Sequence, residues 1–349
     1  MNTAKIHSAC DGACQKGAVL VLVLWILLAI SLLAISFAAA IRTEVDAARN
    51  VINQKQAYYL TRAGIDYAVY KILQAQMAQR VGRAGGFDQA QLGDQQMGAE
   101  EALPEVFTGN LSLQLPQGTV DIKVSPETGK INVNAADGDM LFNLLIMSGL
   151  SQDEADVITD SILDWRDADE QVNGFGAESD YYQSLPEPYY SKNGTFDVPE
   201  ELLLVRGVTP EIYYGRKGTT EDGQRVEFYG LQNYFTTFGQ GRRIDVNAAP
   251  LAVLAALPEI TYDDALAIDE MRQQSPILDL AEVMDRVPGI STNVLGFLGV
   301  ERNALIYTLE AEGRLGEGEA VSRIRCVIRI GGGERGFSVL YWNEANIEL

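Results

Sequence analysis

The chain has 349 residues, 47% of them apolar, which is enough to bury a sizeable core and to form two domains. Its formal net charge of −21 makes nucleic acids and anionic lipid headgroups poor partners. The one histidine, His7, lies at the extreme N-terminus, so the rest of the chain has no imidazole for a Ser-His-Asp relay or a histidine-based zinc site. We therefore expect no enzymatic activity, with carboxylate-only hydrolysis as the one catalytic alternative.

An uncharged apolar run extends from Ala18 to Ile41. At about 1.5 Å per residue, a helix of this length crosses the hydrocarbon core of a bilayer. Lys5 and Lys16 precede the run, whereas the charges that follow it nearly cancel, so the positive-inside rule places the N-terminus in the cytoplasm. We expect a single-pass membrane protein whose remaining residues lie outside the cytoplasm.

Apolar residues continue at helical spacing behind this run to about Arg80, which predicts one uninterrupted helix. Its first half would lie in the membrane and its second, amphipathic half outside. The alternative is a cleaved secretory signal peptide with Ala38-Ala39-Ala40 as its cleavage site. That cleavage would cut the predicted helix in two, and the apolar run is longer than a signal peptide requires.

The region behind the helix contains an internal repeat. The segment INVNAA at 131–136 recurs as IDVNAA at 244–249, and a helical pattern follows each copy. A second pair of matching segments ends near Gly207 and Gly289. The paired starts are 113 positions apart and the paired ends only 82, so the first copy holds about 31 additional residues, which we place at 164–194.

Each copy ends in a helix-Gly-helix pattern with Thr209 or Ser291 as the expected N-cap of the next helix. Such turns resemble helix-hairpin-helix modules, many of which bind the DNA backbone. A phosphate-binding surface needs positive charge, whereas residues 131–303 are rich in Asp and Glu. We interpret the copies as a helical packing unit, and an anchored DNA-binding or DNA-uptake protein is the alternative function.

The additional residues of the first copy include a loop dense in oxygen ligands, from Asp164 to Asp180. Ca²⁺ binds about six to eight oxygens, and crowded carboxylates repel one another without a cation. The spacing from Asp167 to Glu178 partly matches an EF-hand loop, but Val172 occupies the position where that loop needs glycine. The residues alone leave two interpretations equally open, a calcium site and a solvated acidic insertion.

Strand-like segments lie on both sides of the repeats, at 111–115 and 119–124 before them and at 304–311, 321–330 and 337–342 after them. The simplest topology is an antiparallel sheet against the amphipathic half-helix, with a helical domain inserted into it. Residues 331–336 match G-x-G-x-x-G, but a strand follows them, which predicts a hairpin turn rather than a dinucleotide site. The Gln- and Gly-rich residues 74–96 are expected to form the frayed helix end and a linker.

The N-terminus resembles the prepilin pattern of type IV pilins and type II secretion pseudopilins, in which a short Lys-bearing leader ending in glycine precedes an apolar half-helix and an amphipathic half-helix. The resemblance implies cleavage after Gly17 by the prepilin peptidase and N-methylation of Ala18. Cys326 is then the only cysteine of the mature chain, because the other two fall in the leader. Leu22 departs from the pattern, since most such proteins have a glutamate at this fifth mature position.

Further segments extend the resemblance over nearly the whole chain. They are AYYLTRAG at 57–64, GKINVN at 129–134, ILDWRD at 162–167 and EELLLVRG at 200–207. Together with the prepilin start, they resemble minor pseudopilin K of the type II secretion system, the general secretion pathway protein K family. The resemblance implies an α+β, pilin-like fold, in which a long N-terminal helix packs on an antiparallel sheet that carries a large inserted all-α domain of two helix-hairpin-helix-like units.

The resemblance also implies a location and partners. We expect an inner-membrane protein with a periplasmic C-terminal domain that initiates and caps the pseudopilus tip together with I- and J-type minor pseudopilins, other pseudopilins and the inner-membrane secretion platform. Leu22 suits a tip subunit, because a cap has no preceding neighbour whose N-terminal amine a glutamate would pair with. The helix stripe expected to contact these partners comprises Val45, Ile52, Tyr59 and Ala63.

Calcium in the inserted domain is a further implication, and it favours the metal-binding interpretation of the acidic loop. The expected ligands are Asp164, Asp167, Asp169, Glu170, Glu178 and Asp180. The expected organisation is a leader at 1–17, a transmembrane segment at 18–41, the amphipathic half-helix at 42–82, a linker with the first strands at 83–128, the inserted domain at 129–303 with its acidic loop at 164–194, and the C-terminal strands at 304–349.

Overall fold

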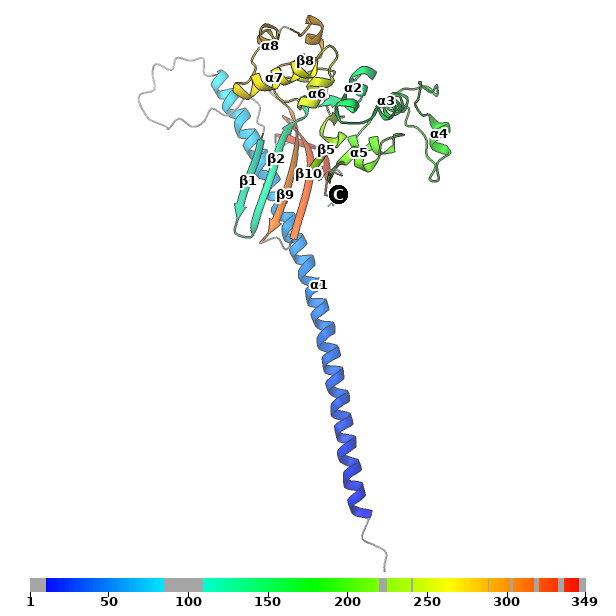
Figure 1. Ribbon diagram of the computed structural model, residues 1–349. Coiled ribbons are helices and arrows are strands. Elements are labelled where there is room, and N and C mark those ends of the chain that lie inside the picture. The colour runs from blue at the N-terminus through cyan, green and yellow to red at the C-terminus, as the bar shows by residue number, and fades with distance from the viewer. Residues whose placement is uncertain are drawn as a thin grey trace, which may run out of the picture.

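The computed structural model describes residues 11–84, 109–219, 225–239, 241–287, 289–301, 304–316, 320–331 and 336–344. Residues 1–10 of the predicted leader, most of the predicted linker and residues 332–335 of the predicted glycine turn lie outside the described residues. A long helix, a five-stranded sheet and a mixed region inserted into the sheet make up the described fold (Figure 1). The α+β class predicted from the sequence is confirmed.

Helix α1 runs without interruption from Asp11 to Ala84, over 74 residues, and extends slightly beyond the expected end near Arg80. It contains no proline, and Ala and Leu, both strong helix formers, dominate its first half. The protein itself buries no side chain between residues 19 and 56, whereas one face is buried from Ala57 onward. Among the described residues, α1 is the one helix long and apolar enough to cross a membrane.

The sheet has the strand order β1-β2-β9-β10-β11, and every neighbouring pair is antiparallel. In β2, Val120 and Ile122 are buried while Asp121 and Lys123 are exposed, because alternate residues of a strand point to opposite faces. One face of the sheet is therefore apolar and the other charged. The strands are β1 (Gly109–Leu115), β2 (Gly118–Pro126), β9 (Ile306–Leu315), β10 (Ala320–Ile330) and β11 (Phe337–Asn343).

The apolar face of the sheet packs on the second half of α1 (Figure 1). Both elements contribute to this core, with Ile72 from the helix and Ile122 and Leu309 from the strands among the buried residues. Gly64 marks a close approach, because a β-carbon at this position would collide with Val120. The small residue thus lets helix and sheet meet without displacing the strand.

Between β2 and β9 the chain forms the inserted domain, which has an apolar core of its own. The expectation of an all-α domain is wrong in one respect, since three two-stranded sheets, β3-β6, β4-β5 and β7-β8, accompany the helices. The first and third are parallel pairs of two residues per strand, and such short pairs leave no periodicity for a sequence to reveal.

The helices of the inserted domain are α2 (Gly138–Met147), α3 (Gln152–Arg166), α4 (Ser179–Gln183), α5 (Pro210–Tyr214), α6 (Leu251–Ala256), α7 (Tyr262–Gln274) and α8 (Leu280–Arg286). The short 3-10 helices are η1 (Glu127–Gly129), η2 (Pro199–Leu204), η3 (Leu231–Asn233) and η4 (Thr292–Gly296). The short strands are β3 (Ile131–Asn132), β4 (Gly215–Thr219), β5 (Arg225–Tyr229), β6 (Phe235–Thr236), β7 (Ile244–Asp245) and β8 (Leu298–Gly299).

The two repeat copies share their local hydrogen bonds. Asn134 donates through Nδ2 to the carbonyl of Phe196 at 2.9 Å and accepts from the amide of Phe196 at 2.8 Å. Asn247 makes the same pair of bonds with Ile277, at 2.8 and 2.9 Å. A side-chain amide can satisfy one backbone donor and one acceptor at once, so each asparagine fastens the returning chain to its repeat motif.

The turn that ends the first copy matches the expected pattern, whereas Gly289 in the second copy has no positive φ and Ser291 caps the 3-10 helix η4. Gly207 has a positive φ of 88°, a conformation that costs glycine least, and Thr209 caps α5 by accepting from the amide of Ile212. Arg166 donates to two carbonyls of the first repeat motif, and Arg272 donates to the equivalent carbonyls of the second. These arginines therefore hold the repeat together from within.

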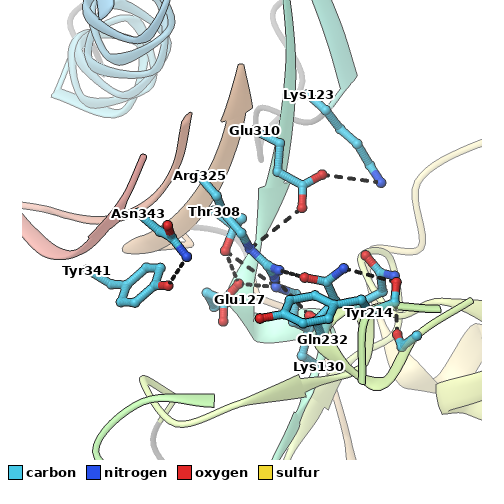
Figure 2. Close-up of polar contacts among 12 residues, drawn as sticks. Lys123, Glu127, Lys130, Tyr214, Gln232, Thr308, Glu310, Arg325, Tyr341 and Asn343 are labelled. Carbon is cyan, nitrogen blue, oxygen red and sulfur yellow. Dashed lines mark hydrogen bonds and ion pairs between the residues drawn. The ribbon is translucent and has the colours of Figure 1, made fainter. Parts of the chain in front are cut away.

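A buried polar network joins the inserted domain to the sheet (Figure 2). Glu127 and Lys130, both almost fully buried, form an ion pair where the chain leaves β2, and Glu127 also accepts a hydrogen bond from Thr308 of β9. Arg325 of β10 donates to the side chain of Gln232 and, at 2.8 Å, to its backbone carbonyl. The network therefore fixes the orientation of the inserted domain on the sheet.

Candidate metal site and partner surface

The acidic loop follows α3 and is held by aromatic packing beneath it. Helix α3 begins at a capping box in which Ser151 and Glu154 bind each other's backbone amides. In its last turn, Trp165 packs edge-on against Tyr182 of α4 and stacks on Phe196, with ring centroids 5.2 and 6.4 Å apart. Both ends of the loop are thus tied to the core of the inserted domain.

Three acidic side chains meet within the loop: Asp164, Asp167 and Glu178. One carboxylate oxygen of each lies within 4.8 Å of the other two. Two oxygens that bind the same Ca²⁺ at about 2.4 Å lie no farther apart than twice that distance, so the cluster has the dimensions of a calcium site. The backbone of Gly176 approaches Asp164 so closely that a β-carbon there would collide with the carboxylate.

Burial and mutual repulsion disfavour the negative charges of the cluster. Burial raises the pKa of Glu178 to about 7, and the charges of Asp164, Glu170 and Asp167 contribute to the increase. Burial likewise raises the pKa of Asp164 above its usual value. Oε2 of Glu178 accepts from Ser191 at 3.2 Å, but the buried Oε1 has no hydrogen-bond partner. Because an unsatisfied buried carboxylate oxygen is costly, a cation bound here would be stabilising, and the residues fit one.

Serine and asparagine side chains connect Glu178 of the cluster to the neighbouring Glu170. Ser191 lies 2.8 Å from Ser179, which donates to Glu170 at 3.1 Å, and Asn193 donates to the same carboxylate at 2.8 Å. Sequence reasoning missed these residues, because isolated serines and asparagines form no pattern that points to a metal.

Three of the six expected ligands lie outside the cluster. Glu170 is engaged by Ser179 and Asn193, Asp169 accepts from the amide of Gln171 at 2.8 Å, and Asp180 is exposed on α4. The five-residue α4 is too short to be the second helix of an EF-hand, in agreement with the glycine missing from the loop.

The other expected functional residues lie on α1. Gly17 and Ala18 are part of the continuous helix. Val45, Ile52, Tyr59 and Ala63 are all exposed, since the face of α1 that packs on the sheet is a different one. An apolar stripe on a helix that its own protein leaves bare is available to lipid or to other helices.

Comparison with known proteins points to one family. Residues 118–215 match the family described as Type II secretion system (T2SS), protein K. Type II secretion system protein K of Pectobacterium carotovorum subsp. carotovorum is 38% identical over 74 residues, which are 21% of this chain and 23% of that protein. Its counterpart in Aeromonas hydrophila is 43% identical over 61 residues, 17% of this chain and 18% of that protein. The matched segments thus span less than a quarter of each relative's length.

A solved structure extends the likeness to most of the fold. The crystal structure of the GspK-GspI-GspJ complex from the enterotoxigenic Escherichia coli Type 2 Secretion System contains a chain that superposes with a TM-score of 0.51, covering 82% of this chain and 99% of that chain at 17% identity. The predicted resemblance to protein K of the type II secretion system is confirmed. At this level of identity, the superposition establishes the shared fold, and the family match covers residues 118–215.

Proposed function

We propose that this protein is a minor pseudopilin that initiates and caps the tip of the type II secretion pseudopilus. The main support for the proposal is the structure of α1. Its first half is apolar and not covered by the rest of the protein, and its second half packs against the sheet. The same chain contains a segment that matches protein K of the type II secretion system. A bare apolar half-helix suits a lipid bilayer before assembly and a bundle of neighbouring helices afterwards.

The proposal includes a maturation step and a location. The prepilin peptidase removes the leader after Gly17, Ala18 is N-methylated, and the chain spans the inner membrane once with its sheet and inserted domain in the periplasm. The positive residues Lys5 and Lys16 in front of the apolar run support this orientation. The inner-membrane secretion platform then extracts the helix into the growing pseudopilus.

The partners at the tip are minor pseudopilins of the I and J types. In support, the solved structure with the same fold is a complex of GspK with GspI and GspJ. The inserted domain lies beyond the end of the sheet that is far from the membrane half of α1 (Figure 1). A further subunit stacked in that direction would collide with it, which supports a capping role. Leu22, where a filament subunit usually has glutamate, removes a charge that a cap could not pair.

Calcium binding by Asp164, Asp167 and Glu178 is part of the proposal. The unpartnered Oε1 of Glu178 and the raised pKa of this side chain support it. A bound Ca²⁺ would neutralise the crowded carboxylates and lock the loop between α3 and α4. We do not propose DNA binding or catalysis, because Arg166 and Arg272 bind carbonyls of their own repeats and the sole histidine lies in the leader.

The test is co-purification of the full-length protein with I- and J-type pseudopilins after substitution of Ile52 on the stripe. Ile52 is 54% exposed, so Ile52→Asp should not disturb the fold, but it would place an unpaired carboxylate in a helix bundle at a cost of several kcal/mol. We expect the complex and protein secretion to be lost.

Gln54→Asp is the matched control, because residue 54 is also exposed but points about 200° away around the helix. This variant should assemble and secrete like the wild type. Normal assembly of Ile52→Asp would refute the stripe as the partner contact, and equal loss in both variants would show that any charge on α1 is disruptive.

A further inference from the structure

An exposed aromatic patch lies beside the acidic loop, on the inserted domain. Phe175 is 61% exposed and Leu204 46%, and both side chains are apolar. Arg206 joins them, since its guanidinium donates to the carbonyl of Phe175 at 3.3 Å and lies 4.7 Å from the ring centroid of Tyr181. We call Phe175, Tyr181, Leu204 and Arg206 the aromatic patch.

Hydrogen bonds hold the backbone that carries the patch. The hydroxyl of Tyr189 donates to the carbonyl of Leu204 at 2.8 Å, and the amide of Arg206 donates to the hydroxyl of Tyr182 at 3.2 Å. The backbone on both sides of the patch is therefore fixed. Aromatic residues and arginine on a rigid backbone are the composition of energetic hot spots in protein interfaces, because little conformational entropy is lost when a partner covers them.

The segment of chain that contains the patch is strongly acidic. From Ser151 to Arg206 the chain has 14 acidic and 3 basic residues, a net charge of −11 and more than half of the −21 of the whole chain. The three basic residues are engaged within the domain: Arg166 by carbonyls, Lys192 by Asp197 and Glu201, and Arg206 by Tyr181. A partner that covers the patch must therefore bring positive charge to its rim.

We propose that the aromatic patch is a docking surface for a segment of another protein that carries large apolar side chains flanked by lysine or arginine. The apolar side chains bury Phe175 and Leu204, and the basic residues contact the acidic rim. Helix α4 lies at the edge of the inserted domain away from α1 and the sheet (Figure 1), so the patch remains accessible while α1 is engaged in a membrane or a helix bundle. The inference does not depend on the tip function proposed above.

The experiment measures binding of fluorescent peptides to the full-length protein in phosphatidylcholine nanodiscs, with empty nanodiscs as the blank. The probe is a short peptide of lysine, leucine and phenylalanine. One reference peptide has serine at the apolar positions, and another has glutamate at the lysine positions. At about 0.15 M ionic strength, where the Debye length is about 8 Å, long-range attraction is screened and local contacts dominate. We expect the probe to bind at least about tenfold more tightly than either reference peptide.

Two double variants locate the binding. Phe175→Ser with Leu204→Ser should weaken binding of the probe at least about tenfold and leave the thermal unfolding midpoint unchanged. Tyr262→Ser with Leu266→Ser, at positions 55% and 39% exposed in the second repeat, should bind like the wild type. Equal affinity for the probe and the serine peptide would overturn the proposal in favour of attraction by charge alone. Unchanged binding by the first variant, equal loss in the second, or no binding of the probe at all would overturn it as well.

Discussion

Replacing Lys130 with methionine should leave the carboxylate of Glu127 buried without a counter-charge. The two side chains are only 7% and 2% exposed. Burial by itself raises the pKa of Glu127, but the charge of Lys130 and hydrogen bonds from Lys130, Thr236 and Thr308 outweigh it and hold this pKa below its usual value. Removal of one partner of a buried ion pair costs about 3–5 kcal/mol, so Lys130→Met should be strongly destabilising.

The assay is thermal unfolding of the full-length protein in detergent. A loss of 1 kcal/mol lowers Tm by about 2–4 °C in a domain of this size, which predicts a decrease of roughly 6–20 °C. Trp165 reports on the inserted domain and Trp342 on the sheet, so tryptophan fluorescence shows whether both parts unfold together. Lys123→Met is the matched control, because Lys123 is 59% exposed and 3.9 Å from Glu310, and such pairs contribute less than about 1 kcal/mol.

A second variant separates charge from packing. Glu127→Gln combined with Lys130→Met removes both charges and should recover more than half of the lost stability. The lowered pKa of Glu127 also fixes the direction of the pH effect. The ionised Glu127 contributes to the free energy of unfolding. This contribution is fully present above the unfolded-state pKa of about 4.3, and it is lost as the pH falls through the lower pKa that Glu127 has in the folded protein. A Tm of Lys130→Met within about 2 °C of the wild type would refute this reasoning.

Three further predictions concern single side chains. Ca²⁺ at about 100 times its Kd should raise Tm by roughly 5–10 °C, and Glu178→Gln should abolish this rise whereas Asp180→Asn should not. Burial raises the pKa of Asp245 to about 6, so the ionised carboxylate lowers the stability of the folded protein above that pH. Asp245→Asn introduces the residue that the first repeat has at the equivalent position, Asn132. This variant should have a higher Tm than the wild type at pH 7.5, and the difference should disappear towards pH 4. Burial raises the pKa of Cys326 to about 12, and a thiol reagent should therefore modify it only as fast as the protein unfolds.

The long helix and the sheet could be predicted because their side chains repeat with simple periods. In β2, buried Val120 and exposed Asp121 alternate as a strand on a half-buried sheet requires, and one face of α1 is apolar every three or four residues from Ala57 onward. The insertion was also visible, since the repeat motifs interrupt the strands. Each of these features can therefore be recognised from a short stretch of the sequence.

The buried polar network that joins the inserted domain to the sheet could not be predicted. Glu127 and Lys130 belong to residue types that usually lie at the surface, and the sequence gives no sign that they are buried. Their hydrogen-bond partner Thr308 is 181 positions away from Glu127, on the far side of the inserted domain. Only the assembled fold brings these groups together, so the interaction with the largest predicted effect on stability is one that the sequence conceals.

The candidate metal site was predictable in part. The density of carboxylates from Asp164 to Asp180 located the loop, but the backbone path decides which of them meet. Asp164 ends up buried because Gly176 passes directly over it, whereas Asp169 is turned to bind its own loop. A count of acidic residues cannot distinguish these two positions, since both have the same chemistry and lie on the same loop.

The two repeats explain why the insertion is free to carry function. The same asparagine bond closes a loop of 62 residues in the first copy, from Asn134 to Phe196, and of 30 residues in the second, from Asn247 to Ile277. Doubling the length of a closed loop costs only about 0.6 kcal/mol, so the scaffold tolerates the longer version. The second copy shows that the scaffold does not need the extra residues. The acidic cluster lies within them, together with Phe175 and Tyr181 of the aromatic patch. The insertion therefore carries the candidate metal site and part of the candidate docking surface.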